Sequence, residues 1–173
     1  GVVNQHGGYV GKSATGGGDW RIGGNSSTAT AGSVGTYNLY GGVFEPQNNF
    51  QIGSWGTGYW NQYGGIANCA SWPAVGRYPG SYGFMTVSGG VFNQTATGNR
   101  LIIAEEGTGT LTITNTGLVT SANGVSIGHQ ATGVGVVNLD GGTLRTTIVL
   151  QPVGGGSSTF NFNGGVLQAG ANN

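Results

Sequence analysis

Charged side chains are scarce in this sequence of 173 residues. Five Lys and Arg residues balance five Asp and Glu residues, so the formal net charge is zero. No run of basic residues is present, and without one a protein lacks the electrostatic attraction through which nucleic acids are bound. A net charge near zero also leaves little repulsion between copies of the chain. The composition therefore argues against nucleic acid as a partner and favours self-association.

Cysteine is almost absent as well. Cys69 stands alone, so no intramolecular disulfide can form. Apolar runs are short, and none approaches the length of about 20 residues that a membrane-spanning helix needs, so we expect no membrane span. The chain begins at Gly1 without an initiator Met or a signal peptide. We expect a mature product or a fragment, with any targeting segment outside this sequence.

Residues for catalysis or metal binding are few and scattered. The five acidic residues are Asp19, Glu45, Glu105, Glu106 and Asp140. Enzymes that cleave glycosidic bonds use paired carboxylates, whereas adjacent residues on an extended chain point to opposite faces. We therefore expect Glu105 and Glu106 to form a solvated corner. The two histidines have no partner at metal-binding spacing. The sequence predicts no enzyme, and no catalytic, metal-binding or cofactor-binding residues.

Glycine, in contrast, is abundant, with 39 residues, and it recurs inside one repeated phrase. The clearest copy is V-V-N-L-D-G-G-T-L at Val136–Leu144, which returns in similar form at Thr36–Phe44 and Thr159–Leu167. After a first interval of 34 residues, the copies follow one another at 23 to 26 residues, a spacing typical of one turn of a β-solenoid. The seven copies have as the first residue of the central pair Gly7, Gly41, Gly64, Gly89, Asn115, Gly141 and Gly164.

Three positions of the phrase are apolar in most copies: four residues before the central pair, two residues before it, and three residues after its first member. Alternation places the first two on one face of a strand, and a bend at the glycines lets the third point into the same core. A further apolar pair follows, such as Phe50 with Ile52, or Ile148 with Leu150. These columns predict an all-β fold, a right-handed parallel β-helix of about seven turns with three short strands per turn.

We expect a single β-solenoid domain over residues 1–173, with a less regular first turn at 1–35 and regular repeats at 36–173. The least regular corner is Asn68–Arg77, where Pro73 stands in place of an expected strand. Proline lacks the N–H group that a strand ladder uses, so strand pairing is expected to lapse at that corner.

One polar column lies between the two leading apolar columns. Parallel stacking at about 4.8 Å per turn would place its side chains in a ladder, with each amide bonded to the next. We favour a structural ladder that stabilises the stack, and the alternative is a polar strip that binds glycans. The members of the column are Asn4, Asn38, Asn61, Thr86, Thr112, Asn138 and Asn161.

Aromatic residues also occupy positions that alternation sends outward. Tyr40 and Tyr63 are expected to be neighbours on the surface, and Trp55 and Trp72 lie in corners close to them in sequence. Exposed aromatic side chains are used by sugar-binding faces and equally by protein–protein contacts. These four residues are a possible surface contact, and the sequence leaves the partner open.

The segment Val136–Leu150 resembles the autotransporter-associated β-strand repeat, also called the passenger-associated transport repeat, and the segments 107–117 and 35–44 are similar to the same pattern. The resemblance covers nearly the whole chain from Thr36 onward. It implies a secreted bacterial β-helix of the kind found in passenger domains, adhesins and large surface proteins, and hence an extracellular or cell-surface location. No catalytic residues belong to the motif, so the resemblance assigns none.

Two features depart from that repeat. Asn115 and Thr116 replace the glycine pair in one copy. Gln5 and Gln62 stand at positions that are otherwise apolar. Buried amides at those positions would need hydrogen-bond partners.

Three functions remain. The first is a structural extracellular protein that assembles head-to-tail with itself into a surface filament or matrix. The second is an adhesin or glycan-binding segment of an autotransporter-like surface protein. The third, a polysaccharide lyase or hydrolase, is disfavoured by the scattered carboxylates. Because the chain shows no capping segment over its first or last copy, we expect the head-to-tail homopolymer, although a segment of a longer solenoid would have the same ends.

Overall fold

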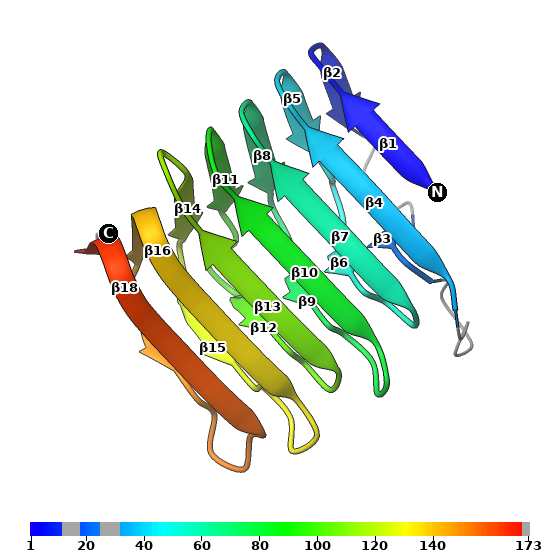
Figure 1. Ribbon diagram of the computed structural model, residues 1–173. Coiled ribbons are helices and arrows are strands. Elements are labelled where there is room, and N and C mark those ends of the chain that lie inside the picture. The colour runs from blue at the N-terminus through cyan, green and yellow to red at the C-terminus, as the bar shows by residue number, and fades with distance from the viewer. Residues whose placement is uncertain (12–17, 25–31, 171–173) are drawn as a thin grey trace.

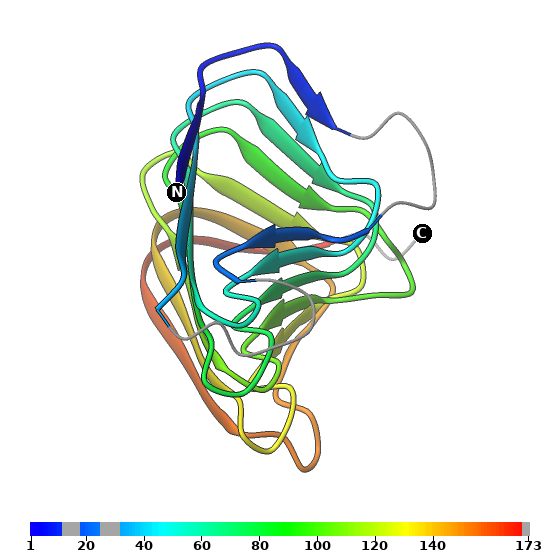
Figure 2. The same ribbon diagram turned by 90° about the vertical axis from the view of Figure 1, so that its right-hand side faces the viewer.

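The computed structural model describes residues 1–11, 18–24 and 32–170. These residues form an all-β parallel solenoid of about five turns, and they contain no helix. Strands of successive turns lie side by side along one axis, with the N-terminus at one end and the C-terminus at the other (Figure 1). Viewed after a rotation of 90°, the turns are stacked as similar loops (Figure 2).

Three strips of parallel strands run along the solenoid, and one pass through them is called a rung here. The first strip contains β1 (Val2–Gln5), β4 (Val34–Leu39), β7 (Thr57–Gln62), β10 (Tyr82–Val87) and β13 (Thr108–Ile113). The second strip contains β2 (Tyr9–Gly11), β5 (Val43–Glu45), β8 (Ile66–Cys69), β11 (Val91–Gln94) and β14 (Leu118–Ser121). The third strip contains β3 (Trp20–Ile22), β6 (Phe50–Ile52), β9 (Pro73–Val75), β12 (Leu101–Ile103), β15 (Val125–Ile127) and β17 (Val149–Leu150).

The C-terminal strands differ from the three short strands expected in each turn. β16 (Val134–Thr146) and β18 (Ser157–Ala169) each run for 13 residues through both the first and the second strip. The first half of β16 stacks on β13 and its second half on β14, and β18 pairs with β16 in parallel. The register shifts on either side of Asp140, as in a bulge that bends a strand without ending it. One continuous strand therefore takes the place of two strands and a corner.

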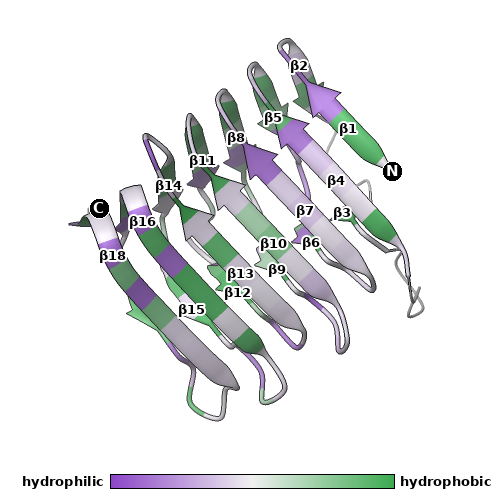
Figure 3. Ribbon diagram, viewed as in Figure 1, coloured by the Kyte–Doolittle hydropathy of each residue, from purple (hydrophilic) through white to green (hydrophobic). Residues whose placement is uncertain are grey.

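Strand pairing is in register along the first strip. Met85 lies opposite Trp60 on one side and Leu111 on the other, and the column continues to Val137. From Tyr37 to Val137 every member of this column is at most 6% exposed. Buried and more exposed residues alternate along these strands, and the alternation of apolar and polar residues is visible along β16 and β18 (Figure 3). The alternation therefore divides each strand between a core face and a solvent face.

Aromatic rings form the widest part of the core. Phe44 lies between Tyr37, Phe50 and Trp60, with ring centroids 4.9 to 5.1 Å apart. Full burial of a side chain of this size stabilises a fold by about 1.5–3 kcal/mol. The rungs that contain these rings are consequently held together mainly by packing.

Two glutamines in the apolar columns find partners at the corners. Gln62 Nε2 donates to the carbonyl oxygens of Gly65 and Val91, at 3.3 and 3.0 Å. Gln5 Nε2 makes the equivalent bonds to Gly8 and to the next rung, also at 3.3 and 3.0 Å. Each buried amide thus links the corner of its own rung to the following rung, and the polar group is satisfied.

Strand pairing does not lapse at Pro73, contrary to the expectation for that corner. Pro73 is the first residue of β9, is buried, and lies opposite Phe50 of β6. On its other side β9 pairs with β12 only from Ala74 onward. A proline that opens a strand leaves no ladder bond unmade, which explains why the strand forms.

The third apolar column is displaced by one residue in the copy that lacks the glycine pair. Its corner is one residue longer than in the other copies, and Asn115 there has a φ of 52°. As a result Val119, and not Leu118, lies opposite Phe92 and is fully buried. The inserted residue fits because asparagine tolerates the left-handed region better than most side chains.

A second displacement occurs at the C-terminal end of the third strip. Val149, and not Ile148, lies opposite Val125. Ile148 is 47% exposed. The corner that leads from Thr146 into this strand is one residue shorter than the preceding corner, so the expected pair of Ile148 with Leu150 is wrong by one position.

Candidate functional site

The polar column predicted as a ladder lies along the outer face of the first strip. Asn38 Nδ2 donates to Asn4 Oδ1 at 2.8 Å, and Asn61 Nδ2 donates to Asn38 Oδ1 at 2.9 Å. Near the other end, Asn161 Nδ2 donates to Asn138 Oδ1 at 2.8 Å. Hydrogen bonds therefore connect side chains that are 23 or more residues apart in sequence.

Thr86 and Thr112 fill the middle of this row, between Asn61 and Asn138. Asn138 Nδ2 donates to Thr112 Oγ1 at 3.4 Å, a longer and weaker contact than the amide pairs. In every bond of the row the donor belongs to the later rung and the acceptor to the earlier one. The row thus has a direction, from the C-terminal end toward the N-terminal end.

Aromatic rings form a second row on the same face. Tyr40 stacks between His6 and Tyr63, with ring centroids 4.7 and 4.9 Å apart and planes within 13° of parallel. Tyr40 and Tyr63 are 44% and 51% exposed. A sugar that packs on an aromatic ring uses the ring face, where the π-electron density lies. Stacking along the axis occupies both faces of Tyr40 and one face of Tyr63, so this row is better suited to hold rungs together than to bind a glycan.

The two tryptophans lie in other corners and have contacts of their own. Trp55 stacks on Tyr78 at 4.2 Å with planes within 6°. The Arg77 guanidinium lies 4.4 Å from the centre of the Trp72 ring and 4.9 Å from that of Tyr78. Both tryptophans are half-buried. The four aromatic residues predicted as a surface contact therefore do not form one group, and the tryptophans are connected only through Arg77, which contacts Trp72, and Tyr78, on which Trp55 stacks.

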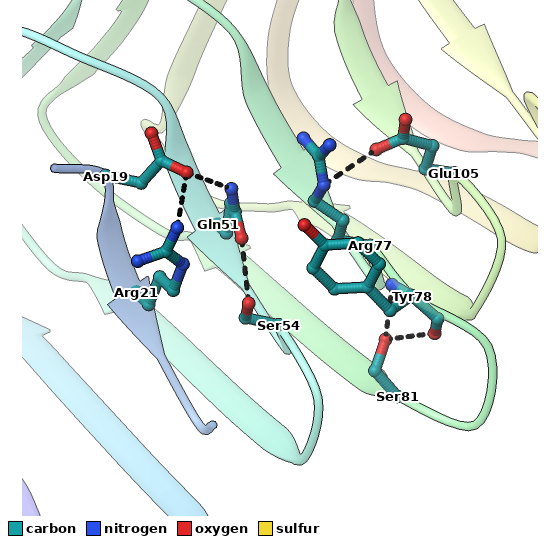
Figure 4. Close-up of polar contacts among 8 residues, drawn as sticks. All are labelled: Asp19, Arg21, Gln51, Ser54, Arg77, Tyr78, Ser81 and Glu105. Carbon is teal, nitrogen blue, oxygen red and sulfur yellow. Dashed lines mark hydrogen bonds and ion pairs between the residues drawn. The ribbon is translucent and has the colours of Figure 1, made fainter. Parts of the chain in front are cut away.

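Polar side chains fold back over the outer face of the third strip. The outward-pointing middle residues of β6, β9, β12 and β15 are all at most 4% exposed, because corner side chains cover them. Gln51 accepts a hydrogen bond from Ser54 Oγ at 2.8 Å and donates to Asp19 Oδ2 at 2.8 Å (Figure 4). Asp19 in turn pairs with Arg21 at 2.7 Å. Polar groups thus follow one another across rungs on this face too.

Arg77, Glu105 and His129 occupy equivalent corner positions on successive rungs. Backbone hydrogen bonds between the corners stack each of them on the one before. Arg77 Nε lies 3.4 Å from Glu105 Oε2, and His129 Nδ1 lies 3.0 Å from Ser126 Oγ (Figure 4 shows the ion pair). Glu105 is only 6% exposed, so the expectation of a solvated corner is wrong for this residue.

Burial changes the protonation of this row. Desolvation raises the pKa of Glu105 from its ordinary value of 4.5 to about 7, although the charge of Arg77 acts in the opposite direction. The neighbouring charge of Glu106 raises this pKa further. Burial lowers the pKa of His129, and the positive charge of Arg100 adds to that effect. Near pH 7 the row therefore contains a partly protonated carboxyl group and a neutral imidazole.

The two perturbed groups do not share a cavity. A hollow of about 220 Å³ is lined by Trp72, Arg100 and His129 among others, but Glu105 is not part of its wall. General acid–base catalysis needs its groups within reach of one substrate. In the described part of the chain, no three His, Cys, Asp or Glu side chains are grouped to hold a metal ion. We therefore interpret the row as a polar cover of the third strip.

The two ends of the solenoid expose columns that are buried in its middle. Leu139 is fully buried, whereas Phe162, the next member of its column, is 59% exposed. Leu167 is 47% exposed at the same end, and Val3 is 51% exposed at the other. The expectation that the apolar columns are buried throughout is therefore wrong for the end rungs. A rung at an end has a neighbour on one side only, and neighbouring rungs supply the burial.

A largely apolar cavity of about 310 Å³ opens at the N-terminal end, with Val3, Tyr37 and Phe44 among its lining residues. Among the described strands, β1 pairs only with β4, and the first half of β18 pairs only with β16. The outer edge of each therefore presents backbone N–H and C=O groups that no described strand pairs. Such edges are templates for pairing with another chain. The ends thus combine apolar surface with open strand edges.

No protein-family model, curated protein or solved structure matches this chain. The resemblance to the passenger-associated transport repeat therefore rests on the sequence phrases alone. Within residues 1–11, 18–24 and 32–170 there is no helix of the length and apolarity needed to cross a membrane.

Proposed function

We propose that this chain is a structural extracellular protein, a β-solenoid subunit that assembles head-to-tail with copies of itself into a filament or matrix at a cell surface. The observation that carries the proposal is the pair of end faces, where Val3, Phe162 and Leu167 are exposed beside strand edges that no described strand pairs. The rows on the outer faces connect rungs to one another, and within the described residues Glu105 is not part of the wall of the cavity that His129 lines. We accordingly assign no enzymatic activity.

Burial of the end faces supplies the driving force for assembly. Covering apolar side chains stabilises a contact by about 25 cal/mol per Å² removed from water. The formal net charge of zero leaves little repulsion to oppose it. A contact between two different ends does not close on itself, so it propagates into a filament.

We further propose that the subunit is one right-handed domain of seven rungs with three strand positions in each. The in-register stacking of β16, β17 and β18 on the earlier rungs supports this count. The extracellular location follows from the resemblance of the repeated phrase to secreted bacterial repeats. A parallel solenoid with few charged residues suits a structural role, in which the chain forms the filament or matrix itself.

Sedimentation velocity over a wide concentration range, with negative-stain imaging of the same samples, tests this function. We expect the sedimentation coefficient to rise with concentration and unbranched fibres to appear. Fibre diffraction should give a repeat of about 4.8 Å along the fibre axis, because the strands run across it. A chain that stays monomeric at every concentration would contradict the proposal.

The second candidate function is glycan binding by an adhesin-like surface protein. It is favoured by the exposure of Tyr59 and Tyr63, which flank Asn61 of the asparagine row on a face with few charges. Titration calorimetry with neutral polysaccharides would detect such binding, and Tyr63→Ala should weaken it. The occupied ring faces in the tyrosine stack make this function the weaker candidate.

A further inference from the structure

We propose that a second copy of this chain docks in register on the first, with β1 of one copy pairing with β18 of the other so that each column continues across the contact. This inference rests on the proposed function and specifies its interface. The successive strand pairings place Val2 in the column of Thr159 and Asn4 in the column of Asn161. The contact would therefore repeat the geometry already present between rungs.

Gly7 is the first indication that a rung lies against the N-terminal end. A Cβ atom at Gly41, Gly64 or Gly89 would lie 2.8, 2.5 or 2.3 Å from a carbonyl oxygen of the preceding rung, so glycine is required there. Gly7 holds the same place in the first rung, but nothing in the described chain lies within 4 Å of its Cβ position. Its φ is also outside the left-handed region. A rung stacked on this end in the geometry of Gly41, Gly64 and Gly89 would make glycine necessary at this position, although Gly164, at the C-terminal end, meets nothing closer than 3.9 Å.

The direction of the asparagine row is the second indication. Asn161 donates to Asn138, and its Oδ1 accepts no hydrogen bond from any described residue. Asn4 accepts from Asn38, and its Nδ2 donates to no described residue. A copy stacked head-to-tail places this donor one rung beyond that acceptor, in the same direction as every other bond of the row. Contact between two like ends would reverse the direction of the row at the contact.

The exposed apolar residues are the third indication. In the proposed register Phe160 is followed by Val3 of the neighbouring copy, and Leu167 is followed by Val10. Phe162, which is 59% exposed, is followed by Gln5 of that copy, a buried amide in the first rung, and Val3 and Tyr37 of the apolar cavity of about 310 Å³ lie in the neighbouring column. The core thereby becomes continuous between subunits. A second copy has the same distances between its columns, because it is built from the same repeat. An unrelated partner would need equally spaced strands to continue the columns.

Two variants each block one end. Gly7→Val places a branched side chain where the Asn163 carbonyl group of the neighbouring copy would lie. Phe162→Glu places a charge on the apolar C-terminal end. Both positions are exposed in the single subunit, so each variant should unfold at nearly the temperature of the parent chain. Circular dichroism at low concentration checks this before assembly is measured.

Two further variants serve as matched controls. Gly98→Val alters a glycine that likewise has nothing within 4 Å of its Cβ position, but lies in a corner away from the ends. Tyr82→Glu removes an aromatic ring that is 49% exposed on the side face of the first strip. Both controls should assemble as the parent chain does if the contact is axial.

Analytical ultracentrifugation of the variants, alone and mixed, tests the register. Each end-blocked variant alone should stay monomeric where the parent chain forms fibres. An equimolar mixture of Gly7→Val and Phe162→Glu should form a species of twice the subunit mass and nothing longer, since one intact end of each kind remains.

The other outcomes overturn the inference. A homodimer of either blocked variant would mean that like ends meet, and a mixture that stays monomeric would also contradict the register. Fibres from both blocked variants, with loss of fibres in Tyr82→Glu, would place the contact on the side face while self-assembly stands. A parent chain that is monomeric throughout would overturn both proposals, as expected if another segment of a longer chain covers these ends.

Discussion

The middle and the ends of the solenoid are built from the same repeated phrase, but their side chains have different surroundings. Leu139 and Phe162 stand at one position of adjacent copies, yet the first is fully buried and the second is 59% exposed. A Cβ atom at Gly90 would lie 2.3 Å from the Gly65 carbonyl oxygen, whereas one at Gly8 would meet nothing within 4 Å. In a repeat fold each rung contacts only its neighbours, so position along the axis decides burial. Equivalent substitutions should therefore have unequal effects.

The largest difference is expected between Leu139→Asp and Phe162→Asp. The first places an unpaired charge in the core and should lower the free energy of unfolding by more than about 4 kcal/mol. The second alters an exposed side chain and should cost the single subunit less than about 1 kcal/mol. Urea denaturation at low protein concentration measures both. Equal losses would show that the two rungs do not differ in burial as described.

A smaller difference is expected between Gly90→Ala and Gly8→Ala. Both glycines have a φ of 71°, so a side chain costs about 1–2 kcal/mol at either position. Only at Gly90 would the new methyl group also collide with the backbone of the preceding rung, which should raise the loss to about 3 kcal/mol or more. Thermal unfolding of the two variants compares them directly. A Gly8→Ala variant that unfolds as early as Gly90→Ala would contradict the argument.

Burial by neighbouring rungs also acts on charge, and Glu105 provides the test. Its pKa is 4.5 when exposed and about 7 in the fold, so the folded state holds the proton more tightly. The stability that this group provides is present in full below pH 4.5 and is lost as the pH rises toward about 7. The whole shift corresponds to at most about 3 kcal/mol.

Glu105→Gln should therefore remove most of the pH dependence of unfolding between about pH 4.5 and 7. Asp140→Asn, which makes the same kind of substitution at an exposed carboxyl group, is the matched control. Denaturation series at several pH values give the profiles. If the parent chain shows no fall in stability across this interval, the burial of the Glu105 carboxyl group is contradicted.

The smallest difference is expected within the asparagine row. Asn38→Ala removes two hydrogen bonds, one as donor and one as acceptor, and should cost about 1–2 kcal/mol. Asn161→Ala removes one and should cost the single subunit about 0.5–1 kcal/mol. The structural role of the row is tested by chemical denaturation of both variants. If Asn38→Ala unfolds at the same denaturant concentration as the parent chain, the asparagine row does not stabilise the fold.

The repeated phrase predicts parallel stacking because its signal is local. Alternation within one strand marks the column of Met85 and Leu111, and a constant spacing brings the copies together. The shift from Leu118 to Val119 is harder to predict, since the copy concerned has no glycine pair to mark the corner. The exposure of Phe162 cannot be read from its own copy, which is as apolar as the others.

The polar cover of the third strip lies outside the repeated phrase, which is why the sequence analysis missed it. Arg77 and Glu105 are 28 residues apart and belong to corners of different composition. Their contact forms because each corner folds back over the strand that precedes it. In the sequence, this geometry is marked only by polar residues three positions apart, such as Gln51 and Ser54. One sequence signal could have revealed that these corners are equivalent. Each begins with a small residue that has a positive φ in the structure, such as Gly76 or Ala104.

Strand direction also determines how such a chain would bear force. The strands run across the axis, so the backbone hydrogen bonds between rungs lie along it, and a pull on the two ends loads them in tension. The strips share the load within a rung, while successive rungs carry it in series. The weakest joint then sets the strength. On the third strip the joints with the fewest paired residues are those between β9 and β12 and between β15 and β17, with two pairs each, so a stretched chain should open this strip at one of these two joints.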